Sequence, residues 1–345
     1  MYSKIVRPIL FLLSPEKIHS LVVNGIKVGF RIPGIKWLIK KVAQIDHPSL
    51  QRSVFGLNFK NPVGFAAGFD KNAEVFEDFG AFGFSFIEIG TVTPKPQAGN
   101  PKPRSFRLKA DKALINRMGF NNKGVQYATH KLKKRKGNII IGGNIGKNTI
   151  TPNESAVNDY LFCFKELYDY VDYLVVNISC PNVANLRHLQ DGEQLGLILD
   201  TLIAERKQRK VYKPILLKVS PDLNNEQLDE TITKAVESGI DGFIATNTTT
   251  SRENLTTDSE KVKSIGNGGL SGAPLTNRST EVIRYIHAKT SGTKPIIGVG
   301  GILTPEDAIE KLNAGASLIQ VYTGFIYSGP MLVKQINKAL IARTK

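Results

Sequence analysis

The sequence predicts an α/β protein: a (β/α)8 TIM barrel preceded by a short helical extension. From about residue 45, short apolar runs alternate with longer amphipathic stretches, the βαβ pattern of a parallel sheet with helical crossovers. Eight such apolar runs occur, and eight parallel strands close a barrel. A chain of 345 residues also has a suitable length for one barrel domain with an appendage.

The predicted strands share β-branched and apolar residues bounded by polar ones. They cover residues 62–67, 86–92, 139–145, 173–179, 215–219, 242–246, 295–299 and 317–321. Residues 224–239 and 304–314 are expected to be helices of the outer ring. No linker or low-complexity tract interrupts this pattern, so we expect two units, an extension at 1–44 and a barrel at 45–345.

Composition limits the possible classes of protein. Hydrophobic residues make up 41% of the chain, and no apolar run approaches the roughly 18 residues that a membrane span needs. Two cysteines, Cys163 and Cys180, cannot form a disulfide framework and indicate a reducing compartment. The formal charge of +16 favours an anionic surface or ligand without specifying which.

The first 44 residues are predicted to form an amphipathic helical pair. Apolar residues recur at helical spacing on both sides of Ser14 and Pro15, which suit an N-cap and a first helical position. Cations outnumber the single acid, Glu16, and Trp37 lies among lysines. These features are typical of helices lying on an anionic bilayer. Alternatively, the apolar face packs on the barrel, or the pair does both by capping a tunnel. A signal peptide fits poorly.

The stretch 173–182 combines a buried strand with reactive and hydrogen-bonding side chains at the carboxyl end of that strand. Its first half, 173–177, is apolar except for Asn177, and Ser179, Cys180 and Asn182 lie in its second half. The amides both donate and accept hydrogen bonds, and the thiol of Cys180 can move a proton at a carbon centre. The alternative interpretation is a buried structural cysteine beside turn-forming asparagines.

The other predicted strands also end in small or amide-bearing residues. Because barrel active sites form at the carboxyl ends of the strands, we expect these residues to converge on one pocket. Gly298, Gly300 and Gly301 precede a predicted helix, and residues 322–324 follow strand eight. Backbone N–H groups in such places bind phosphate, although glycines there also serve tight turns.

Lysine and asparagine side chains indicate what else the pocket binds. Lys218 ends a strand that reads as fully buried, and an unpaired ammonium there would be costly. A reduced flavin, which is anionic near neutral pH, would offset that cost. Lys71 could instead pair with Asp70 or Glu74 at the surface. Asn116, together with the amide side chains at the ends of strands four and six, could form hydrogen bonds to a ring that carries alternating donor and acceptor groups.

Long motifs give the chain a family resemblance. They are residues 61–72, 90–101, 115–121, 144–148, 177–182 and 268–272. In these motifs the chain resembles dihydroorotate dehydrogenase, specifically the membrane-associated class that uses quinone. The resemblance covers nearly the whole chain. It implies an FMN enzyme that oxidises dihydroorotate to orotate in pyrimidine (UMP) biosynthesis.

The resemblance also assigns roles to individual residues. It implies that FMN is held by Ala67, Gly68, Lys71, Thr91, Asn144, Asn177, Lys218, Thr246, Gly272, Gly301, Tyr322 and Thr323. It implies that dihydroorotate is held by Lys71, Asn116, Arg117, Met118, Gly119, Phe120, Asn177, Asn182, Asn247 and Thr248. His19 and Arg107 would lie at the quinone entrance. No metal site is expected.

The chain departs from the family pattern at Cys180. The quinone-using class normally has serine there, and cysteine is usual in the soluble class. A thiol with a pKa of about 8.5 is partly ionised near neutrality, whereas a hydroxyl is a weak base. The hypothesis is that Cys180 takes the C5 proton of dihydroorotate while hydride passes from C6 to the flavin. The soluble class uses fumarate or NAD, but the N-terminal helical pair with His19, and Arg107, favour quinone as the oxidant.

Three alternative functions remain beside the quinone-using enzyme. They are a soluble-type dihydroorotate dehydrogenase, a flavin barrel that reduces uridine in tRNA, and a peripheral membrane scaffold without catalysis. The placement of positive charge in the extension disfavours tRNA. We therefore expect a monomer that binds no nucleic acid, contacts anionic lipid, and lies peripherally on the cytoplasmic face of a bacterial inner membrane.

Overall fold

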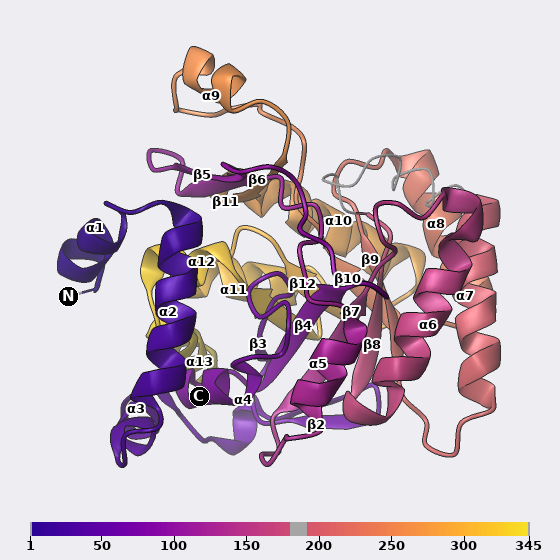
Figure 1. Cartoon of the computed structure of the whole chain (residues 1–345), viewed down its shortest axis with the longest axis horizontal. Helices are drawn as coiled ribbons and strands as arrows, with labels where there is room; N and C mark the ends of the chain where they lie inside the picture. Colours follow the sequence, from indigo (N-terminus) through magenta and orange to yellow (C-terminus); the bar gives the residue numbers. More distant parts are fainter. Residues whose placement is uncertain (1, 180–191, 344–345) are drawn as a thin grey trace.

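Eight parallel strands close into a barrel in the computed structural model, which describes residues 2–179 and 192–343 (Figure 1). The strands are β3 (Val63–Phe65), β4 (Phe86–Val92), β7 (Ile140–Ile145), β8 (Tyr173–Asn177), β9 (Ile215–Val219), β10 (Gly242–Ala245), β12 (Ile296–Val299) and β13 (Leu318–Val321). Each overlaps one predicted strand, and β13 pairs with β3 to close the barrel. The predicted fold class is confirmed.

Helices surround the barrel, as the alternating pattern predicts. They are α4 (Phe76–Phe79), α5 (Val125–Leu132), α6 (Ala156–Leu167), α7 (Gly192–Lys207), α8 (Asn225–Ser238), α10 (Thr276–Lys289), α11 (Pro305–Asn313), α12 (Thr323–Ser328) and α13 (Leu332–Ala342). Capping boxes at Asn224 and Thr304 start α8 and α11. In each, the side chain of the cap accepts from the backbone N–H of the third helical residue, and the side chain of that residue accepts from the backbone N–H of the cap. Both helices lie where the sequence predicts them.

The amino end of the barrel is filled and closed by apolar side chains. Phe59, Phe86 and Tyr173 form part of a buried cluster there, and the ring of Phe86 occupies the space that a Cβ on Gly64 would need. A hairpin of β1 (Arg52–Val54) and β2 (Leu57–Phe59) contributes to this cluster. The packing leaves the carboxyl ends of the strands as the open end of the barrel.

A second sheet stands at that open end. It consists of β5 (Ser105–Leu108), β6 (Ala113–Asn116) and β11 (Gly269–Gly272), paired antiparallel in the order β11-β6-β5. The helix α9 (Ser259–Ile265) projects beyond this sheet in Figure 1. The sheet brings Asn116 and Gly272 to the pocket described below. The sequence patterns predicted neither this sheet nor the hairpin below the barrel.

The extension holds one more helix than the predicted pair. A helical segment at Tyr2–Val6 continues into α1 (Arg7–Leu10), and α2 (Pro15–Gly29) and α3 (Ile35–Ala43) follow. Figure 1 places them along one side of the barrel. Val23 and Ile26 of α2 are buried, so one face of α2 packs on the barrel. Gly34, with φ of 86°, separates α2 from α3.

Much of the extension's apolar surface nevertheless faces outward. Its exposed large apolar side chains are Ile5, Val6, Ile9, Leu12, Leu13, Leu21, Val28, Ile32, Trp37, Leu38 and Val42. No single helix among the described residues is long and apolar enough to cross a membrane. Tyr2–Leu10 and Pro15–Gly29 reach that length and composition only together, with a bend of 112° between them.

Candidate functional site

One pocket gathers most of the predicted site residues at the carboxyl ends of the barrel strands. Its volume is about 1170 Å³, including the space open to solvent at its mouth. The predicted residues that line it are Ala67, Gly68, Lys71, Thr91, Asn116, Met118, Gly119, Phe120, Asn177, Lys218, Thr246, Asn247, Thr248, Gly272, Gly301, Tyr322 and Thr323. The structure therefore brings together residues that the sequence scatters from 67 to 323.

Several predicted residues lie elsewhere. Asn144 is fully buried behind Thr91 and does not line the pocket. Arg117 points away, because its guanidinium donates to the carbonyl oxygens of Ile265 and Pro103 in the neighbouring loops. His19 lies in α2 of the extension, and Arg107 lies in β5 and contacts the extension. Cys180 and Asn182 fall outside the residues that the structure describes.

Sequence analysis missed some residues that line the pocket. They include Ser105, Leu114, Ser271, Leu275 and Gln320. Most of them come from the second sheet or the segment after it, which the strand pattern did not reveal. Gln320 did carry a signal, since it is the polar residue in an otherwise apolar strand.

A chain of amide and hydroxyl groups crosses the base of the pocket. The Thr91 hydroxyl donates to Asn144 Oδ1 at 2.5 Å and accepts from Asn177 Nδ2 at 2.9 Å. Asn247 Nδ2 donates to Asn177 Oδ1 and to Ser179 Oγ, both at 3.1 Å. Four barrel strands or their exits contribute to this chain, so the amides hold one another in fixed rotamers.

The ammonium of Lys218 is not unpaired, which corrects one inference from the sequence. Lys218 Nζ lies 3.6 Å from Glu88 Oε1, and the Glu88 side chain is fully buried inside the barrel. The carboxylate also accepts from Asn144 Nδ2 at 2.7 Å and from Gln320 Nε2 at 2.6 Å. The cost of burying Lys218 is thus offset within the chain, with no ligand needed for that purpose.

Lys71 provides a second positive charge at the pocket, and it does not pair with Asp70 or Glu74. Its ammonium donates to the carbonyl oxygen of Gly68 at 2.6 Å. Burial and the nearby charge of Arg104 lower the pKa of Lys71 from 10.5 to about 8. Lys71 therefore stays mostly protonated at neutral pH and can attract a carboxylate entering the pocket.

Glycines form a tightly packed rim at one end of the pocket. A Cβ on Gly301 would lie 2.1 Å from Thr276 Oγ1, and one on Gly324 would lie 2.0 Å from the carbonyl oxygen of Ile302. A Cβ on Gly272 would lie 2.3 Å from the carbonyl oxygen of Lys112. Only glycine permits this close approach, and glycine-rich segments of this kind can present backbone N–H groups to an anion.

The extension contacts the barrel beside the pocket. His19 Nε2 lies 2.8 Å from the carbonyl oxygen of Phe69 and therefore donates to it. Burial and the charge of Lys71 lower the pKa of His19 to about 4, so the ring is neutral at pH 7. Arg107 donates to the carbonyl oxygen of Leu13 at 2.6 Å, and its guanidinium lies over the ring of Phe11. The predicted entrance residues thus lie where extension and barrel meet.

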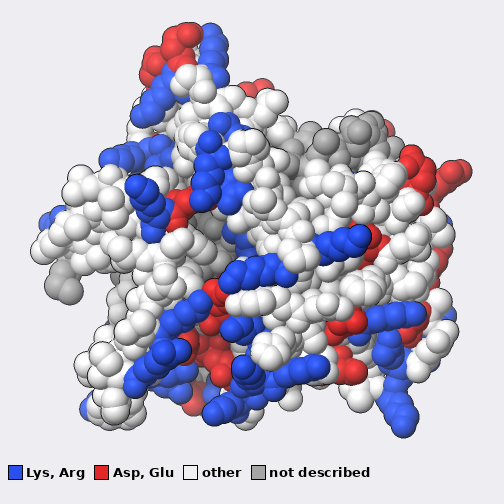
Figure 2. All heavy atoms as spheres, viewed as in Figure 1, with Lys and Arg blue, Asp and Glu red and all other residues white. Residues whose placement is uncertain are grey.

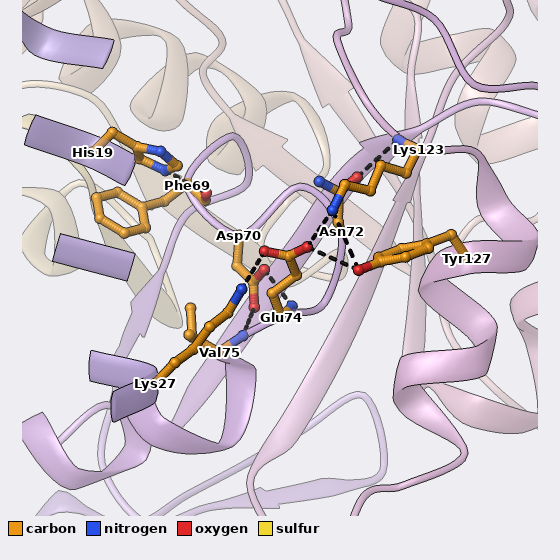
Figure 3. A network of polar contacts seen from close by, with 9 residues as sticks. All are labelled: His19, Lys27, Phe69, Asp70, Asn72, Glu74, Val75, Lys123 and Tyr127. Atoms are coloured by element: carbon orange, nitrogen blue, oxygen red, sulfur yellow. Dashed lines mark hydrogen bonds and ion pairs between the residues drawn. The ribbon is translucent and has the colours of Figure 1, made fainter. Parts of the chain in front are cut away.

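A polar network centred on Glu74 ties the extension to the loop that carries Lys71 (Figure 3). The Glu74 carboxylate accepts hydrogen bonds from Lys27 of α2 at 2.5 Å, from Lys123 at 2.8 Å and from Tyr127 of α5 at 3.0 Å. Asp70 accepts the backbone N–H of Glu74 at 2.7 Å. Burial alone would raise the pKa of Glu74, but the three donors outweigh it and lower the pKa to about 2.

Replacing Glu74 with glutamine is expected to lower the free energy of unfolding by about 1–3 kcal/mol at pH 7. Because the folded pKa of about 2 lies below the ordinary value of 4.5, this stabilisation is complete above pH 4.5 and is lost as pH falls toward 2. Urea unfolding of both proteins should therefore show a difference that narrows below pH 4.5. Glu260→Gln, at an exposed ion pair, should cost under about 0.5 kcal/mol. An equal loss of unfolding free energy in the Glu74 and Glu260 variants would contradict a specific stabilising role for Glu74.

No metal centre is evident in the part of the chain that the structure describes. Nowhere in residues 2–179 and 192–343 do three or more His, Cys, Asp or Glu side chains gather in a way that could hold an ion. The pocket instead offers amides, hydroxyls, backbone N–H groups and two lysines, which suit an organic anion.

Comparisons with known proteins agree with the site. The family model for dihydroorotate dehydrogenase matches residues 49–343. Dihydroorotate dehydrogenase (quinone) of Christiangramia forsetii is 55% identical over 343 residues and covers 99% of both chains. The protein of the same name from Corynebacterium efficiens is 46% identical, over 97% of this chain and 88% of its own.

A solved structure gives the same result. DHODH from Eimeria tenella, in complex with ferulenol, superposes with a TM-score of 0.83 at 37% identity, covering 96% of this chain and 91% of that one. These relatives do not favour the soluble-class or tRNA alternatives, and the family uses a flavin cofactor. The match spans nearly the whole barrel and the pocket residues within it. The chain belongs to the dihydroorotate dehydrogenase family.

Proposed function

We propose that this chain is a quinone-dependent dihydroorotate dehydrogenase. It binds FMN, oxidises dihydroorotate to orotate in pyrimidine biosynthesis, and passes the electrons to a membrane quinone. The observation that carries the proposal is the pocket in which amides, two lysines and a glycine rim converge from strands around the barrel. A relative that is 55% identical over 99% of this chain is named dihydroorotate dehydrogenase (quinone).

The pocket residues fit FMN in both charge and shape. The rim at Gly272, Gly301 and Gly324 offers backbone N–H groups for a phosphate, and Thr323 adds a hydroxyl. Lys218 offers a positive charge to the flavin ring, while Thr91 and Asn177 offer polar edges. When bound, the flavin supplies a two-electron acceptor for the hydride that leaves C6 of dihydroorotate.

The substrate lies, in this proposal, between Lys71 and the asparagines. Lys71 is mostly protonated at neutral pH and attracts the carboxylate of dihydroorotate. Asn116, Asn247 and Thr248 line the pocket and can meet the amide groups of the ring. Met118 to Phe120 complete this wall, and Asn182 would join it from outside the described residues. Arg117 supports the wall from behind, since its guanidinium binds carbonyl oxygens of neighbouring loops.

Cys180 is proposed as the base that removes the C5 proton. It follows Ser179 directly, whose hydroxyl is already used as a donor to the carbonyl oxygen of Lys218 at 2.8 Å. The Ser179 hydroxyl also accepts from Asn247, so it already serves both as a hydrogen-bond donor and as an acceptor. The neighbouring thiol is the group in this segment that can ionise near neutral pH.

The extension is proposed to hold the protein on a membrane at the quinone entrance. Its exposed apolar side chains and the contacts of His19 and Arg107 with the junction support this role. Figure 2 shows a mostly uncharged surface over α1, beside a face carrying α2 and α5 on which cations are mixed with acids. An uncharged surface with cations beside it suits an anionic bilayer. We propose a peripheral monomer on the cytoplasmic face of a bacterial inner membrane.

Reoxidation by different acceptors tests the proposal. The protein is reduced anaerobically with dihydroorotate and mixed with a vesicle-embedded quinone, a water-soluble quinone, fumarate or NAD. We expect both quinones to restore the oxidised flavin band much faster than fumarate or NAD. Equal or faster reoxidation by fumarate or NAD would contradict the proposed oxidant.

A pair of matched variants tests the membrane contact in the same assay. Leu12 is 82% exposed on the extension, and Ile150 is 81% exposed on the barrel. Leu12→Glu should slow turnover with vesicle-embedded quinone about tenfold, because about 1.5–3 kcal/mol of apolar burial is lost. Turnover with water-soluble quinone should not change, and Ile150→Glu should affect neither. Equal losses in both variants would contradict a specific role for the extension.

A further inference from the structure

We propose that Glu88 is an ionised positioning residue that pairs with Lys218 and thereby lowers the reduction potential of the bound flavin. The inference rests on the proposed flavin site and concerns a residue that does not line the pocket. Glu88 lies on β4 inside the barrel, and its side chain has no exposed surface. It is the polar residue in a strand segment that is otherwise apolar up to Gly90.

Three other barrel strands direct hydrogen-bond donors at this carboxylate. Asn144 of β7 donates to Oε1 at 2.7 Å, and Gln320 of β13 donates to Oε2 at 2.6 Å. Lys218 of β9 places its ammonium 3.6 Å from Oε1. Packing of the barrel does not require this arrangement, because an apolar side chain of similar volume would avoid the cost of burying a charge.

A backbone group fixes the direction of the amides that lead to Glu88. The N–H of Thr248 donates to Asn247 Oδ1 at 2.9 Å, and a backbone N–H cannot act as an acceptor. Asn247 must therefore turn its Nδ2 toward Asn177 Oδ1, which is 3.1 Å away. Asn177 in turn directs its Nδ2 at Asn144 Oδ1, at 3.3 Å. The remaining Nδ2 of Asn144 faces Glu88.

This fixed direction favours the ionised form of Glu88. The carboxyl group meets only donors: the amide of Asn144 and the ammonium of Lys218 at Oε1, and the amide of Gln320 at Oε2. A proton on either oxygen would have no acceptor in this arrangement, whereas a carboxylate accepts from both amides and faces the ammonium. Hydrogen bonds of this kind, with one charged partner, are about twice as strong as neutral ones.

The pair then controls how much positive charge the pocket presents. Lys218 lines the pocket, and its charge alone would stabilise a reduced, anionic flavin. Glu88 balances that charge from just below, in an interior where such interactions are weakly screened. The reduced flavin is therefore less stabilised than it would be beside an unpaired lysine. In this way Glu88 keeps the flavin a better electron donor to the quinone.

Potentiometry of the flavin-loaded protein tests the inference without relying on activity. Glu88→Gln keeps the shape and removes the charge, and it should shift the two-electron equilibrium at least tenfold toward the reduced flavin. That shift corresponds to a rise of about 30 mV in the midpoint potential. Glu88→Asp keeps the charge and should differ from wild type by less than threefold.

The outcomes of these measurements separate the role of Glu88 from the proposed function of the protein. A Glu88→Gln protein with wild-type flavin content and an unchanged potential would overturn the role of Glu88. Equal shifts in the Gln and Asp variants would overturn it too, because geometry would then matter and charge would not. If the Gln variant does not fold, the Asp variant still tests the inference, because a tenfold shift in that variant, which keeps the charge, would overturn it. Wild-type protein that holds no flavin would instead overturn the proposed function.

Discussion

Flavin reduction by dihydroorotate is expected to slow by about 10²- to 10⁴-fold when Cys180 is replaced with alanine. The proposed role of the thiol is to take the C5 proton, and alanine has no group that can do so. Anaerobic stopped-flow mixing with dihydroorotate, followed at the oxidised flavin band, measures this step apart from reoxidation. Flavin content should stay at the wild-type level, since Cys180 is not proposed to hold the cofactor.

Two other variants make this result specific. Cys163 is the other cysteine, fully buried in α6, where burial holds the pKa of its thiol well above the ordinary value. Cys163→Ala should therefore leave the rate of flavin reduction unchanged. Cys180→Ser should give an intermediate rate that rises with pH over a higher range, because a hydroxyl ionises less readily than a thiol. A wild-type rate in Cys180→Ala would remove Cys180 from the mechanism.

Replacing Gly301 with alanine is expected to weaken flavin binding by about 10- to 100-fold. Its φ of 72° is unfavourable for alanine, and the new Cβ would lie 2.4 Å from Thr276 Cα as well as close to its hydroxyl. The loop after β12 must then move away from α10, which displaces its backbone N–H groups from the proposed phosphate. Loss of charge-assisted hydrogen bonds of about 1.5–3 kcal/mol accounts for the effect. Titration of apoprotein with FMN measures it.

Gly266 supplies a matched control. Its φ of 74° is nearly the same, yet a Cβ there would meet no atom within 4 Å, and Gly266 does not line the pocket. Gly266→Ala should therefore cost about 1 kcal/mol of stability and leave FMN affinity unchanged. If both variants lose FMN to the same extent, backbone strain accounts for the loss, and the rim does not bind the phosphate.

The barrel and the place of its pocket were predictable because both depend on local patterns. Buried strands such as 173–177 stand out as apolar runs, and parallel strands bring their carboxyl ends to one side. Asn177, Lys218 and Asn247 therefore could be placed together without knowledge of their contacts. Their shared position in the pocket follows from topology alone.

Long-range pairing was not predictable in the same way. The second sheet joins Asn116 to Gly269 by antiparallel pairing between segments far apart in the chain. The partner of Lys218 was also hidden, although Glu88 interrupts an apolar strand and so carries a signal. Arg117 stands next to pocket residues in sequence, yet its side chain points to the other side of the chain, toward Ile265.

Anaerobic titration of the purified protein with dihydroorotate tests most directly whether this pocket holds a flavin that the substrate reduces. About one FMN per chain should be released on denaturation, and about one equivalent of dihydroorotate should bleach the oxidised band while forming orotate in equal amount. A colourless protein that does not take up FMN, or a flavin that stays oxidised in excess dihydroorotate, would contradict the proposed function.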